Sequence, residues 1–128
     1  MLKNRAKIAE AGAVPRLIEL LPSPDTQMVE QSLAILESLS TISEGRSTIV
    51  GHALAVPSIV RSLLAVYDNA VGILLGVCFN SAEEDLLVEI VKMGTLERLL
   101  FLLQIDCSAR TKQKANELIR ILSSPPAQ

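Results

Sequence analysis

Residues 11–21 read Ala-Gly-Ala-Val-Pro-Arg-Leu-Ile-Glu-Leu-Leu, and two later stretches repeat this pattern. Residues 53–64 read Ala-Leu-Ala-Val-Pro-Ser-Ile-Val-Arg-Ser-Leu-Leu, and residues 93–103 read Met-Gly-Thr-Leu-Glu-Arg-Leu-Leu-Phe-Leu-Leu. Measured from Gly12 to Leu54 and from Leu54 to Gly94, the copies are 54 − 12 = 42 and 94 − 54 = 40 residues apart. The chain is therefore built on an internal repeat with a period of about forty residues.

Each repeat contains only helical patterns, in the order short helix, second helix, long third helix. In the first repeat, Gly12 is expected to end the short helix, because glycine accepts the positive φ of a helix end. Pro15 suits the first turn of the second helix, and Asp25 is expected to cap the third. Helical repeats of this period are typical of armadillo and HEAT proteins. The sequence therefore predicts an all-α, right-handed armadillo-repeat α-solenoid (an α-α superhelix) of about three repeats.

The predicted repeats cover residues 1–124, as units at about 4–42, 43–80 and 81–124, and residues 125–128 form a tail. Ser81 and Glu84 have the spacing of a capping box that would start the third unit. Residues 69–79 are apolar on every side, so we expect that helix to be buried all round. The middle unit is about five residues short between its second and third helices. Its third helix should therefore start more than a turn late, or follow almost without a loop.

Composition excludes several classes of function. The formal net charge is −2 and aromatic residues make up 2% of the chain, which argues against binding to nucleic acid. No apolar run reaches the roughly eighteen residues of a membrane span, and the charged start resembles no signal peptide. Cys78 and Cys107 show no C-x-x-C spacing and the chain has one histidine, so a zinc site would lack ligands. Cys78 is expected to be a small buried side chain. We expect a cytoplasmic protein that can also be nuclear.

The sequence contains no pattern of catalytic residues. His52 is the single histidine and is expected to sit near a helix C-terminus. A G-x-S-x-G nucleophile motif and a glycine-rich phosphate loop are both missing from the sequence. We therefore expect no catalytic residue, no metal and no cofactor in this chain.

The chain resembles the armadillo repeats at the C-terminal end of plant U-box E3 ubiquitin ligases. The matching pieces are the block at residues 11–21, the helix at 70–78, and the final stretch with 91–94, 99–104 and 112–118. The resemblance covers nearly the whole chain. It implies that the intact ligase carries a U-box, which recruits a ubiquitin-charged E2, and that the armadillo array binds the substrate. The U-box itself is expected to be absent here, so E2 would be reached only through a missing segment.

In such a solenoid, successive third helices line a concave groove. We aligned the three helices on Ser32, Ala70 and Ala115 and took the positions two and six residues later as facing the groove. The position one residue before each anchor joins them. The predicted partner-binding residues are Gln31, Ala34, Ser38, Asn69, Gly72, Gly76, Lys114, Glu117 and Ile121. The alternative for Gly72 and Gly76 is that they only permit close helix packing.

Two hypotheses for the function remain open. The first is a protein-interaction module, the substrate-binding region of a U-box ubiquitin ligase that lacks the U-box and has no catalytic site of its own. The alternative is a stand-alone armadillo adaptor or scaffold with no role in ubiquitin transfer. In either case the first unit has an uncovered edge, where we expect Leu2, Ile8 and parts of Leu17 and Leu33 to be exposed. Self-association through that edge is expected.

Overall fold

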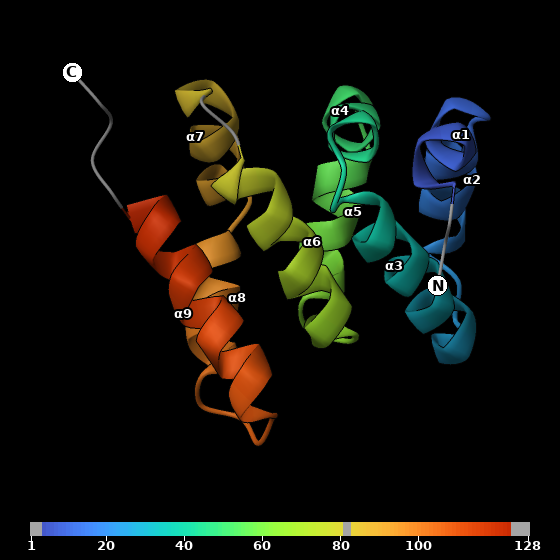
Figure 1. Cartoon of the computed structure of the whole chain (residues 1–128). Helices are drawn as coiled ribbons and strands as arrows, with labels where there is room; N and C mark the ends of the chain where they lie inside the picture. The colour runs from blue at the N-terminus through green and yellow to red at the C-terminus, as the bar shows by residue number, and fades with distance from the viewer. Residues whose placement is uncertain (1–3, 81–82, 124–128) are drawn as a thin grey trace.

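The structure is a computed structural model that describes residues 4–80 and 83–123, and within these ranges it contains helices and no strand. The helices fall into three successive units of two short helices and one long one (Figure 1). The bounds are α1 (Arg5–Glu10), α2 (Ala13–Leu20) and α3 (Thr26–Leu39), then α4 (Ser43–Gly51), α5 (Ala55–Ser62) and α6 (Tyr67–Phe79), then α7 (Glu84–Lys92), α8 (Thr95–Leu102) and α9 (Ala109–Ser123). The all-helical fold predicted from the repeat is confirmed.

The ends of the helices follow from single residues. Gly12 and Gly94 have φ values of 88° and 83°, a left-handed conformation that glycine adopts without steric strain, and each separates two consecutive short helices. Asp25 caps α3, because its Oδ1 accepts hydrogen bonds from the Gln27 and Met28 amides at 3.1 and 3.3 Å. Both predictions are confirmed. The predicted capping box cannot be followed, because Ser81 lies outside the described residues.

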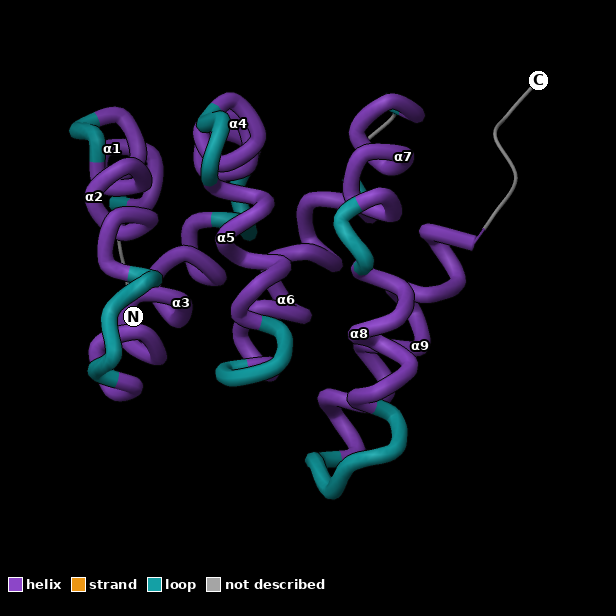
Figure 2. The backbone as a smooth tube through the Cα atoms, turned by 180° about the vertical axis from the view of Figure 1, so that it is seen from behind, coloured by secondary structure: helices purple, strands orange, loops and turns teal. Residues whose placement is uncertain are grey.

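Corresponding helices of the three units stack in layers. The long helices α3, α6 and α9 lie side by side, and α6 packs against both of the others (Figure 1). Seen from behind, α2, α5 and α8 form the opposite layer, with α1, α4 and α7 at one end of the units (Figure 2). The largest fully buried side chains are leucines and isoleucines from all three units, among them Leu33, Ile59, Ile73, Leu74 and Leu99. The core therefore runs continuously from the first unit to the third.

The middle unit is shortened mainly inside its third helix. α6 begins at Tyr67, three residues before its buried residue Ala70, whereas α3 and α9 begin six residues before Ser32 and Ala115. The turn before α6 covers residues 63–66, so it has four residues against five before α3 (21–25). α6 thus starts three residues late, which is less than the full turn or more that was expected, and its loop is not absent.

Two burial predictions were wrong. α6 is not buried all round: Phe79 is 69% exposed, and Gly72, Leu75 and Gly76 are half-buried, because α3 and α9 cover its flanks and leave its outer side open. Leu33 was expected at an exposed edge, yet it is fully buried, since α1 and α2 of its own unit cover this part of α3. Ile8 and Leu17 are half-buried, and Leu2 lies outside the described residues.

Candidate partner-binding face

The nine residues predicted to bind a partner all lie on α3, α6 and α9. None of them is buried. Gln31 and Ala34 are exposed, and the other seven are half-buried: Ser38, Asn69, Gly72, Gly76, Lys114, Glu117 and Ile121. We call the solvent-facing side of α3, α6 and α9 the third-helix face; it is turned toward the viewer in Figure 1.

The centre of this face is the outer stripe of α6. Gly72, Gly76 and Phe79 follow one another at spacings of four and three residues, so they lie on one side of the helix. The opposite side of the helix carries the buried residues, including Ala70, Ile73 and Val77. Phe79 therefore places an exposed aromatic ring at the C-terminal end of a stripe that begins with two glycines.

Glu37 of α3 joins all three long helices. Its Oε1 accepts a hydrogen bond from the Asn69 amide of α6 at 2.8 Å, and its Oε2 contacts the Lys114 ammonium of α9 at 3.3 Å. The Glu37 carboxylate occupies the place where a side chain at Gly72 would begin, so a Cβ there would overlap it. The absence of a side chain at Gly72 thus lets Glu37 and Lys114 meet across the outer side of α6.

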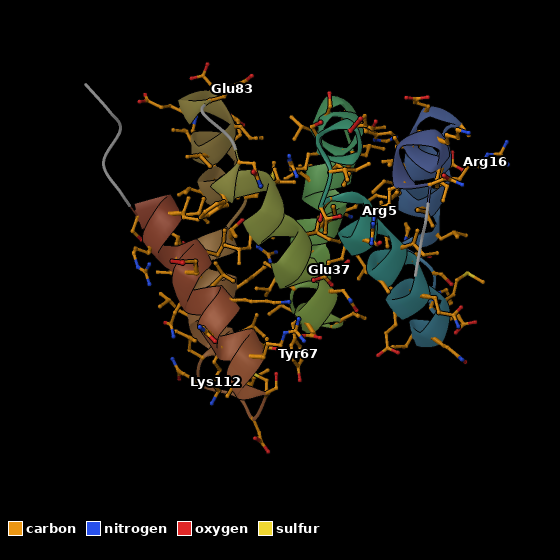
Figure 3. All side chains as sticks on the ribbon, in the orientation of Figure 1. Arg5, Arg16, Glu37, Tyr67, Glu83 and Lys112 are labelled. Carbon is orange, nitrogen blue, oxygen red and sulfur yellow. The ribbon has the colours of Figure 1, made fainter. Side chains whose placement is uncertain are left out.

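Two further polar contacts extend across this face. The Thr111 hydroxyl of α9 donates to Asp68 Oδ1 of α6 at 2.6 Å, and the Arg5 guanidinium of α1 donates to the Ser38 hydroxyl of α3 at 3.0 Å. Arg5 and Glu37 lie on the same side of the molecule (Figure 3). The third-helix face is therefore polar along a band that crosses all three units.

The structure brings together only some of the predicted residues. Asn69, Gly72 and Lys114 meet around Glu37, and Ser38 contacts Arg5. Glu117 instead pairs with Arg120 on its own helix, and Ile121 packs against the core.

Sequence reasoning missed Glu37 and Phe79. Glu37 lies off the buried stripe of α3, but nothing in the sequence of one helix indicates which neighbouring helix such a carboxylate will reach. Phe79 was counted with the apolar surroundings of α6. Its place in the same helical stripe as Gly72 and Gly76 was a usable signal, because those two glycines were themselves placed in the groove.

Cys78 lies on the buried side of α6, and burial raises the pKa of its thiol from 9.0 to about 12, so it is protonated and unreactive at neutral pH. Within residues 4–80 and 83–123, His, Cys, Asp and Glu side chains form no group of three or more that could hold a metal ion. In the same ranges, no helix combines the length and the apolar character needed to cross a membrane.

Comparison with known proteins places the chain in one family. Residues 2–125 match the family model described as the plant U-box protein ARM repeat region. U-box domain-containing protein 30 of Arabidopsis thaliana is 36% identical over 123 residues, which cover 93% of this chain and 27% of that protein. U-box domain-containing protein 26 of the same plant is 38% identical over 125 residues, with coverages of 94% and 29%.

A third relative is named as a ligase. E3 ubiquitin-protein ligase PUB23 of Arabidopsis thaliana is 32% identical over 127 residues, with 93% of this chain and 31% of that protein covered. The chain thus spans less than a third of the length of these relatives. Together with the three stacked helical units, the match over nearly every residue means that this chain belongs to the armadillo repeat region of plant U-box proteins.

Proposed function

We propose that this chain is the substrate- or partner-binding region of a U-box E3 ubiquitin ligase, and that the partner docks on the third-helix face. The observation that carries this proposal is the 69% exposed ring of Phe79, which continues the stripe of the half-buried Gly72 and Gly76 on the outer side of α6. Glu37 covers Gly72, so a partner can approach the backbone of α6 closely at Gly76, and Phe79 offers a large apolar anchor at the end of the stripe. An amphipathic helix or an extended segment of a partner fits such a surface.

The polar band limits what the partner can be. Glu37 and Lys114 already neutralise each other, so the centre of the face carries no unpaired charge that would attract a strongly charged peptide. Apolar contact with Phe79 and backbone contact over Gly76 would then supply most of the affinity. Gln31 and Ala34, both exposed on α3, would line the neighbouring side of the bound segment.

The chain offers a matched test, because its two phenylalanines lie on different layers. Phe79 is 69% exposed on α6, and Phe101 is 54% exposed on α8. A photo-crosslinking residue at Ala34 would first identify a partner from the plant that carries the protein. Binding of that purified partner would then be measured with the Phe79→Ala and Phe101→Ala variants. We expect Phe79→Ala to weaken binding at least about tenfold, as truncation of an aromatic anchor does, and Phe101→Ala to leave it unchanged. The reverse result would place the partner on the other layer.

A second experiment separates the ligase from the adaptor. The segment encoded upstream of this chain would be read first, and a U-box there favours the ligase. The chain would then be joined behind the U-box of a relative such as PUB23 and supplied with E1, E2, ubiquitin and the partner. Ubiquitin transfer to the partner that depends on Phe79 supports the ligase, whereas binding without transfer supports the stand-alone adaptor. The chain without a U-box should transfer no ubiquitin in this assay.

Self-association through the first unit remains a second, separate proposal. Met28 is 39% exposed on α3 and Leu20 is 38% exposed on α2, and Ile8 and Leu17 are half-buried beside them in the same unit. Sedimentation of the purified chain over a range of concentrations tests it, and a monomer at all concentrations would reject it.

A further inference from the structure

A cavity of about 180 Å³ lies between the first and second units. The turn after α2 and the first turns of α3 form one wall, and the last turn of α5 with the turn after it forms the other. The cavity therefore exists only because two neighbouring units meet there. No residue of the predicted partner-binding set lines it.

The floor of this cavity is apolar. Leu21, Val29 and Val66 line it, and each of them is less than 8% exposed. Such a floor accepts an apolar side chain or the methylene groups of a longer polar one, because burying them removes apolar surface from water.

The rim of the cavity carries hydrogen-bond donors and one positive charge. Arg61, Thr26 and Ser58 line it, and within the described residues none of their side chains makes a hydrogen bond or an ion pair. Asp25 directly precedes the rim residue Thr26, but it does not line the cavity, and its Oδ1 accepts hydrogen bonds from the amides of Gln27 and Met28. The Arg61 guanidinium therefore stands over an apolar floor with no anion opposite it.

The repeat itself does not require an arginine at this position. The helices α2, α5 and α8 have the equivalent C-cap residues Leu21, Leu63 and Leu103, so the residues equivalent to Arg61 are Glu19 and Phe101. The three units share the leucine at the helix end and differ in the residue two positions before it. The charge at Arg61 thus belongs to this one junction and has no part in the common packing of the units.

We propose that this cavity binds a carboxylate side chain of a partner protein, an Asp or Glu next to an apolar residue. The apolar residue would enter the cavity, and the carboxylate would pair with Arg61, whose planar guanidinium matches a carboxylate in two parallel hydrogen bonds. One cation matches the single charge of a carboxylate. A phosphate group brings a charge of about −1.5 to −2, which would be poorly balanced by one arginine.

Amide-resolved NMR of the whole chain tests this proposal with defined probes. The peptide acetyl-Leu-Glu-Leu-amide is the probe, its Leu-Gln-Leu analogue removes only the charge, and a Leu-phosphoserine-Leu analogue supplies phosphate. We expect the glutamate peptide to shift the amide signals of Thr26, Ser58 and Arg61, and the glutamine peptide to bind at least about tenfold more weakly. The amide signals of Gly72, Gly76 and Phe79 should not move, so this result is independent of the proposed function.

Two variants complete the experiment. Arg61→Gln removes the exposed cation and should weaken binding of the glutamate peptide about tenfold, while its own amide spectrum verifies that the fold is intact. Arg16→Gln changes an exposed arginine of α2 outside the cavity, labelled in Figure 3, and should have no effect. Equal binding of the glutamate and glutamine peptides, or unchanged binding by Arg61→Gln, would overturn the proposal. Tighter binding of the phosphoserine peptide would overturn the choice of a carboxylate.

Discussion

The Glu37 carboxylate of α3 and the Lys114 ammonium of α9 lie 3.3 Å apart, although 77 positions separate them in the chain and α6 lies between their helices. They meet because Gly72 has no side chain at the point where the contact crosses α6. Both side chains are mostly covered, with 28% of Glu37 and 22% of Lys114 exposed. This ion pair therefore links the first unit directly to the third. The main helix–helix packing, by contrast, joins each unit to the next one along the chain.

The first prediction concerns Gly72→Ala. The new Cβ would overlap the Glu37 carboxylate, which can move away because it ends a flexible side chain, so the Glu37–Lys114 contact should be lost. Alanine in a helix interior offsets this by about 0.5–1 kcal/mol, and the net change in the free energy of unfolding should be small. A double-mutant cycle measured by urea unfolding detects the loss of the Glu37–Lys114 contact separately from this net change. Glu37→Gln should cost about 0.5–1 kcal/mol in the natural chain and nothing measurable beside Gly72→Ala. An equal cost in both backgrounds would contradict this account of Gly72.

Gly76→Ala is the matched control for that prediction. A Cβ at Gly76 would lie 3.4 Å from the Ser40 hydroxyl oxygen, which is ordinary contact. The same substitution one turn further along α6 should therefore stabilise the chain by about 0.5–1 kcal/mol and leave the Glu37→Gln effect intact.

The second prediction compares two glycines of α4. At Gly45 a Cβ would overlap the backbone carbonyl of Leu39, and backbone cannot move aside as a side chain can. Gly45→Ala should therefore lower the free energy of unfolding by about 2–3 kcal/mol. At Gly51, in the same helix, nothing lies within 4 Å of the added Cβ, so Gly51→Ala should be neutral or stabilising by up to about 1 kcal/mol. Thermal unfolding followed by circular dichroism distinguishes the two, and similar melting temperatures would refute the close approach of α4 to α3.

Local rules were enough to predict the helices and their order. The positive φ at Gly12 and the Asp25 cap depend only on neighbouring residues, and the order of the helices follows from the repeated pattern; the structure confirms each of them. The contact between Glu37 and Lys114 could not be predicted in this way. It depends on how α3 and α9 are placed beside α6, and that placement follows from packing among all three units.

Burial at the first unit shows the same limit. Leu33 was predicted to be partly exposed because it belongs to the first unit, which has one side without a neighbouring repeat. Leu33 does not lie on that side, because it belongs to the core inside its own unit. α1 and α2 enclose Leu33 from within its own unit. The position of the partner-binding residues on α3, α6 and α9 followed from the alignment of the repeats, whereas their use by a partner stays a prediction.

The third prediction tests that burial. Leu33→Ala should lower the free energy of unfolding by about 3 kcal/mol, because it removes a fully buried side chain and leaves a cavity. Met28→Ala lies on the same helix, where Met28 is 39% exposed, and should change stability by no more than about 0.5 kcal/mol. Urea unfolding of the two variants gives the comparison. A small effect of Leu33→Ala would mean that this edge is open in solution.

The fourth prediction follows from the Cys78 thiol, whose pKa is raised from 9.0 to about 12 by burial behind α6. Below pH 9 the thiol keeps its proton in both the native and the unfolded chain, so Cys78 contributes a constant amount to stability. Between pH 9 and 12 the unfolded thiol loses its proton while the native one keeps it, so stability falls by up to about 1.4 kcal/mol per pH unit. Other groups titrate in this range, and comparison with Cys78→Ala removes them, since Cys107 is present in both chains. The difference in the free energy of unfolding between the natural chain and Cys78→Ala should be constant from pH 7 to 8.5. Above pH 9 the natural chain should lose stability relative to the variant. If the free energy of unfolding of the two chains changed in parallel up to pH 10.5, the Cys78 thiol would be accessible to solvent in the folded protein.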